Sequence, residues 1–193
     1  MGGEVITIAA GSENHINAMD MLEGYGDSGN PVGDKSQFIM SLFEQLDRDG
    51  IKPVDRSIID RCVTLVFQDY YRTRKMPTLV TLREKLLEQP EIEDKKFGFV
   101  NLNCLQMDHW MHLHTKQIVN TSSRIVSYDI FKLGKQLKTM GLLVITDAMI
   151  NRVNENWRKG KRTHIILDEF HVVFENEESA SFFICVSIIP VSE

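Results

Sequence analysis

Two adjacent carboxylates at the end of a short apolar run are the residues of this sequence best suited to chemistry. Residues 162–167 read RTHIIL and are followed at once by Asp168 and Glu169, which is the form of a Walker B strand. The first carboxylate after such a strand can hold Mg²⁺ through water, and the second can orient or polarise an attacking water. We therefore assign Asp168 to metal and nucleotide binding and Glu169 to catalysis. The alternative interpretation is an ordinary core strand that ends in a solvated turn.

No loop able to hold nucleotide phosphates accompanies these carboxylates. The pattern G-x-x-x-x-G-K-[ST] occurs nowhere in the 193 residues. Residues 29–36 approach it, but Asp34 stands between the second glycine and Lys35, and its carboxylate would repel phosphate. Residues 160–163 lead into the apolar run rather than into a helix. We expect neither stretch to bind phosphate, and we expect Asp34 to cap a helix instead.

A histidine cluster is a second place where chemistry could occur. His109 and His112 share a helical face, whereas His112 and His114 share a strand face, so no single regular element directs all three toward one metal ion. A site with a closed shell would also need a fourth ligand, which the sequence does not identify. We prefer to interpret these histidines as part of an irregular connection, and we keep a metal site as the alternative.

Composition points to a globular protein of one domain, or of one domain with an inserted lobe. The chain has 42% apolar and 25% charged residues and a net charge of -5, which argues against a duplex-binding surface over the whole molecule. Three cysteines without C-x-x-C pairing suit a reducing compartment. The apolar runs are too short for a signal peptide or a membrane span. We expect a cytoplasmic protein unless a partner recruits it to a membrane.

Hydrophobic periodicity indicates a helical lobe set inside a β-α-β frame. Strands are predicted at 4–10, 124–130 and 162–167, and a long irregular connection covers 11–33. Amphipathic helices are predicted from Asp34, with Gln37 in the capping-box position, from Pro53, and after Pro77 with Thr78 as the cap. Residues 142–157 predict a further helix, although 142–146 could form a strand. Residues 97–120 show no clear period.

Several short motifs, taken in order, resemble one family. They are INAMD at 16–20, DKSQFIMSLFEQL at 34–46, IIDRCV at 58–63, PTL at 77–79, YDI at 128–130, NRV at 151–153 and DEF at 168–170. Together they resemble the C-terminal motor domain of the VirB-type conjugative-transfer ATPases, the TraG/TraE-like P-loop proteins of type IV secretion systems. The similarity runs from about residue 5 to residue 183, and the ordered series is more specific than any single motif.

The resemblance implies an α/β fold, a partial RecA-like P-loop NTPase core with an inserted helical lobe. We expect one partial motor domain over residues 1–193, made of a strand and Gly-rich connection (1–33), the helical lobe (34–96), an irregular segment (97–123), an α/β part with Walker B (124–183) and an atypical tail (184–193). In the family Mg-ATP is the cofactor, so that Asp168 would serve Mg²⁺ through water and Glu169 the catalytic water. The implied partners are subunits of the secretion or conjugation machinery, in a hexamer at the inner membrane, with DNA contacted indirectly.

Three departures from the family shape the functional hypothesis. The phosphate loop expected upstream of Val5 is missing, residues 97–118 do not look like the family, and residues 184–193 are apolar where a basic helix is expected. We expect a fragment of a conjugative-transfer ATPase that binds no Mg-ATP tightly and does not hydrolyse ATP alone. The alternatives are a non-catalytic helical module that docks on an intact motor, and a metal-binding protein that uses His109, His112 and His114.

Overall fold

The chain folds as a mixed α/β structure around a small parallel sheet. The computed structural model describes residues 3–9, 12, 14–22, 24–26, 29–46, 51–90, 123–133 and 135–168. Strands β1 (Glu4–Thr7) and β2 (Val126–Asp129) are parallel, with Glu4 opposite Val126 and Thr7 opposite Asp129. Both strands lie where the sequence predicts them. The segments between them cross over through helices, as parallel pairing requires.

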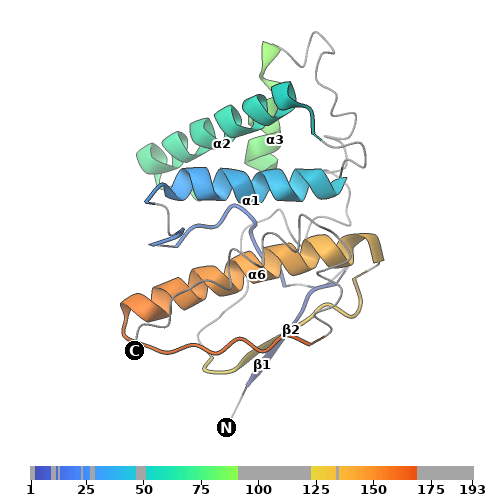
Figure 1. The fold of residues 1–193 in the computed structure, drawn as a ribbon, viewed down its shortest axis with the longest axis vertical. Helices are drawn as coiled ribbons and strands as arrows, with labels where there is room; N and C mark the ends of the chain where they lie inside the picture. Colours follow the sequence, from blue (N-terminus) through green and yellow to red (C-terminus); the bar gives the residue numbers. More distant parts are fainter. Residues whose placement is uncertain are drawn as a thin grey trace.

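Among the described residues, four helices are stacked on one side of this sheet, and one of them lies between the sheet and the other three (Figure 1). Helices α1 (Pro31–Leu46), α2 (Pro53–Thr73) and α3 (Leu79–Leu87) pack on one another and are called the helical unit below. Helix α6 (Lys135–Arg158) contacts α1 on one side, and β1 and β2 lie on its other side. We call β1, β2 and α6 the α/β unit. One core cluster of buried apolar side chains includes residues of both units, so the helical unit and the α/β unit share a core.

Helix α1 begins three residues before the predicted start at Asp34. Asn30 is the N-terminal cap, because its Oδ1 accepts a hydrogen bond from the Gly33 N–H at 3.2 Å. Pro31 follows as the first helical residue, where a missing N–H costs nothing. Asp34 lies in the first turn, where its charge complements the helix dipole. The capping prediction at Asp34 was therefore wrong in position, although the predicted helix is present.

Helices α2 and α3 begin at the predicted signals. Helix α2 has Pro53 at its start and ends before Arg74, and it buries one apolar face that includes Ile59, Val63 and Phe67. Thr78 caps α3, with its side chain accepting from the Thr81 N–H while the Thr81 side chain accepts from the Thr78 N–H. The three predicted helices between residues 31 and 87 are therefore present.

The segment after α6 differs from its prediction. Helix α6 begins at Lys135 rather than at 142, which rules out the alternative strand at 142–146. Residues 162–167 were predicted as a buried strand, but they form no strand, and Ile166 is 92% exposed. Only Leu167 of this run packs against the core. An apolar run becomes a strand only where a neighbour supplies ladder partners, and among the described residues the sheet has β1 and β2 alone.

The longest parts of the predicted segments that lie outside the described residues are 91–96 of the helical lobe, most of 97–123, 169–183 of the α/β part and the whole tail 184–193. Within the described part of the chain, none of the helices combines the length and the apolar character that a bilayer crossing demands.

Gly26 and Gly29 offer a matched test of how tightly the connection before α1 is packed. Both have φ of +75°, so alanine at either position costs about 1 kcal/mol in backbone strain. A Cβ at Gly26 would lie 2.8 Å from Asp34 Cγ and 3.1 Å from Asp34 Cβ, whereas nothing lies within 4 Å of one at Gly29. We expect Gly26→Ala to lower the free energy of unfolding in urea by about 1 kcal/mol more than Gly29→Ala. Equal losses would contradict this packing.

Candidate functional site

A buried ion pair joins the helical unit to the α/β unit. Lys35 of α1 and Asp147 of α6 meet with 2.7 Å between Nζ and Oδ2, and their side chains are 0% and 7% exposed. Lys35 lies on the apolar face of α1, three residues before Phe38 and four before Ile39. Asp147 lies on the corresponding face of α6, three residues after Val144. Each helix thus places one charge in an otherwise apolar stripe.

The connection 14–26 completes the surroundings of the Lys35 ammonium group. Its Ala18 carbonyl oxygen accepts a hydrogen bond from Lys35 Nζ at 3.3 Å. The ring of Tyr25 lies under the same nitrogen with 4.0 Å to its centroid, and the ring of Phe38 lies 4.8 Å away. The Tyr25 hydroxyl donates to Asp147 Oδ1. Both carboxylate oxygens and the ammonium group are therefore satisfied inside the protein.

Burial shifts the pKa values of this cluster toward the neutral forms. The loss of hydration lowers the pKa of Lys35, although Asp147 opposes the shift. The same cause raises the pKa of Asp147, against the effects of Lys35 and Tyr25. Burial followed by the neighbouring Asp147 charge raises the pKa of Tyr25 well above its ordinary value. Desolvation thus outweighs the favourable pairing for Lys35 and Asp147.

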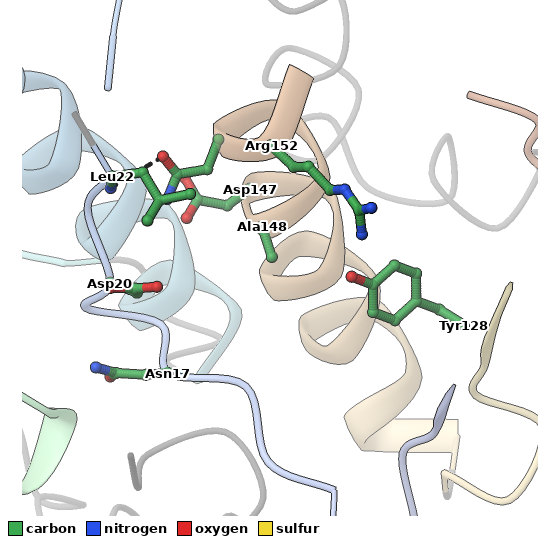
Figure 2. Close-up of a pocket in the computed structure, with 8 residues that line it drawn as sticks. Asn17, Asp20, Leu22, Tyr128, Asp147, Ala148 and Arg152 are labelled. Atoms are coloured by element: carbon green, nitrogen blue, oxygen red, sulfur yellow. Dashed lines mark hydrogen bonds between the residues drawn. The ribbon is translucent and has the colours of Figure 1, made fainter. Parts of the chain in front are cut away.

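A small polar cavity opens beside the pair (Figure 2). It lies between the connection 14–26, β2 and α6, and Figure 2 shows the Asp20 carboxylate directed toward α6 with Tyr128 and Arg152 on the opposite side. Its volume of about 30 Å³ has room for roughly two water molecules, not for a nucleotide. Burial is the main cause that raises the pKa of Asp20. The charge of Lys35 opposes this rise, and the charge of Asp147 adds to it. The lining residues are Asn17, Asp20, Leu22, Tyr128, Asp147, Ala148, Asn151 and Arg152.

Two buried asparagines hold the connection 14–26 against both units. Asn17 Nδ2 donates to the Pro77 carbonyl oxygen at 2.8 Å, just before α3, and Asn17 Oδ1 accepts from the Met19 N–H at 3.1 Å. Asn151 Oδ1 on α6 accepts from the Leu22 N–H at 3.1 Å. The irregular backbone can therefore be buried because side chains replace the hydrogen bonds that a strand or helix would supply.

Of the site residues that the sequence predicts, the structure describes Asp168. Asp168 is exposed and follows the run 161–167, on a different segment from the residues around the cavity. Glu169 and the histidines His109, His112 and His114 lie outside the described residues, so their assigned roles stay predictions. Among the residues that are described, no three His, Cys, Asp or Glu side chains are grouped as a metal site.

Lys35, the lysine of the stretch 29–36, contacts a carboxylate and a carbonyl oxygen. A triphosphate needs backbone N–H groups and a lysine to offset its charge. Lys35 is directed to Asp147 and the Ala18 carbonyl, so it is not available to phosphate. The rejection of residues 29–36 as a phosphate loop agrees with this geometry, since residues from Pro31 onward are helical.

Sequence reasoning missed the ion pair, although the signals for it were present. The motifs that carry the family resemblance include most of the residues gathered here, but their meeting in space could not be read from their order. A lysine on the apolar face of α1, and an aspartate and an asparagine four residues apart in the apolar stripe of α6, are signs of buried polar groups. Tyr25 and Asp147 fall outside the motifs. The residues within them are Asn17, Asp20, Lys35, Pro77, Tyr128, Asn151 and Arg152.

Asp20→Asn tests the electrostatics of the cavity. Because the pKa of Asp20 is raised above 3.8, its carboxyl contributes stability that is present below that pH and lost as the pH rises through the raised pKa. We expect the stability of the wild type, relative to that of the variant, to fall as the pH rises above about 4. Urea unfolding at several pH values measures this difference.

Asp69→Asn is the control for the change in net charge, because Asp69 lies at the surface and pairs with Arg72 at 2.8 Å. A difference between wild type and Asp20→Asn that is flat with pH would contradict the buried position of this carboxyl.

Comparisons with known proteins support the fold. No family model matches the sequence, and no curated protein matches it. The solved structure of VirB4 of Thermoanaerobacter pseudethanolicus matches with a TM-score of 0.73 and 16% sequence identity, over 96% of this chain and 77% of that chain. The chain therefore has the fold of this VirB4 structure, which confirms, at the level of the fold, the resemblance to VirB-type ATPases.

Proposed function

We propose that the chain is part of a conjugative-transfer ATPase of type IV secretion and that it does not hydrolyse ATP alone. The observation that carries the proposal is the VirB4-like fold over 96% of the chain. The family motifs add support, because residues from several of them gather around one cavity. On this proposal the α/β unit belongs to a partial RecA-like core, and the helical unit is the lobe inserted into it, with the domain limits given by the sequence.

The proposal that the chain does not hydrolyse ATP alone rests on the negative charge of the triphosphate, which must be offset for binding. Asp168 and Glu169 keep their proposed roles as a metal ligand and a catalytic carboxylate, but both are anions and cannot offset a triphosphate. The 193 residues contain no phosphate-loop pattern, and Lys35 is held by Asp147. Nucleotide turnover would require a phosphate loop from another polypeptide or segment. The partners that fit are motor subunits of the secretion machinery.

Isothermal titration of Mg-ATP into the chain tests the limitation on ATP binding. We expect no binding of micromolar strength and the same trace for Asp168→Ala, because the sequence has no phosphate-loop pattern and Lys35 is held by Asp147. Asp69→Ala, which removes another surface carboxylate, is the matched control. Micromolar binding that survives in Asp69→Ala and is lost in Asp168→Ala would show that the chain has a nucleotide site of its own.

The assignment to type IV secretion is tested by a separate experiment. An intact VirB-type motor, mixed with the chain and passed through a sizing column, should elute together with it. The ATPase rate per motor subunit should then change while the chain alone stays inactive. Independent elution and an unchanged rate would count against a role in this machinery.

A further inference from the structure

The contacts between the two units are of two kinds. Apolar side chains of α1 and α6, such as Phe38 and Val144, belong to one core cluster. Such contacts are favourable in many relative positions of two helices, because the hydrophobic effect is not directional. The Lys35–Asp147 pair is directional, since its 2.7 Å contact ends if α1 slides along α6 by one residue.

The pair is also fixed from other directions. Lys35 Nζ is held at once by Asp147, the Ala18 carbonyl oxygen and the face of the Tyr25 ring. Asp147 is held by Lys35 and by the Tyr25 hydroxyl. These groups come from three segments, namely α1, the connection 14–26 and α6. A network that satisfies every buried polar group has one arrangement, and displaced arrangements leave a charge unpaired.

The stability that this network adds is small compared with the stability that a pair of apolar side chains would add at the same place. Both side chains are almost completely buried, and the cost of desolvating two ions is close to the energy that their pairing returns. The pKa shifts agree with this cost. Burial lowers the pKa of Lys35 and raises that of Asp147, so each shift favours the neutral form. A pair of similar apolar side chains would fill the same space without that cost.

We infer that the buried Lys35–Asp147 pair sets the orientation of the helical unit on the α/β unit, instead of adding to the stability of the fold. The pair, called the joint below, fixes the angle between α1 and α6. After α6 the chain turns at residues 159–160 and continues as the run 161–168, so this angle also affects where the run lies relative to the helical unit. The inference does not depend on the proposed function.

Residual dipolar couplings of backbone amides test the joint in the full chain. Couplings from α1, α2 and α3 should fit the same alignment tensor as those from α6 in the wild type. In Lys35→Met/Asp147→Leu we expect the melting temperature to stay within about 4 °C of the wild type. We expect the two sets of couplings in this variant to require two different tensors. The same substitutions at an exposed pair, Lys85→Met/Glu88→Leu, should leave one tensor.

A single tensor and unchanged couplings in the buried double variant would overturn the inference. Lys35→Met/Asp147→Val serves as a second variant in case leucine overfills the site. Failure of both variants to fold would also overturn it, because the pair would then be a source of stability and not of orientation.

Discussion

Burying the Lys35 ammonium group imposes a requirement on the rest of the molecule. Its charge must be balanced and its hydrogens must be accepted, and the structure meets both needs with Asp147, the Ala18 carbonyl and an aromatic face. The connection 14–26 has to approach closely enough to supply two of these groups. Its irregular path, with Gly24 and Gly26 at positive φ, follows from that demand.

The same network explains the layering in Figure 1. Helix α6 faces the helical unit through Asp147 and the connection 14–26 through Asn151, while β1 and β2 lie on its other side. Helix α6 is thus the element of the α/β unit that packs against α1. The solved VirB4 structure shares this fold. The activity itself is a proposal.

The parts of the fold that could be predicted were those with local causes. Pro53 and the Pro77–Thr78 pair begin helices by short-range chemistry, so α2 and α3 start where expected. The start of α1 was misplaced because Asp34 and Gln37 have the spacing of a capping box, whereas the true cap, Asn30, is followed three residues later by Gly33 and lacks that pattern. The apolar run 162–167 has the composition of a buried strand, but composition does not supply a pairing partner. The family resemblance, carried by the order of the motifs, predicted the fold better than any single motif.

The candidate site required information that a single sequence does not contain. Lys35 and Asp147 are 112 residues apart, and nothing local identifies one as the partner of the other. A polar residue in an apolar stripe indicates burial, but many partners would satisfy it. The carboxylates Asp168 and Glu169 drew attention because their pattern is local, whereas the cavity lined by Asp20, Asn151 and Arg152 is formed only by the folded chain.

The most direct test of the central claim is to observe the ammonium group of Lys35 by ¹H–¹⁵N NMR. Exposed lysine ammonium protons exchange with water too quickly to be seen near neutral pH, whereas buried and hydrogen-bonded ones are protected. The account predicts a protected ammonium signal at about pH 6 that disappears in Lys35→Met. If no such signal is lost in the variant, Lys35 is in contact with water and the buried joint does not exist in solution.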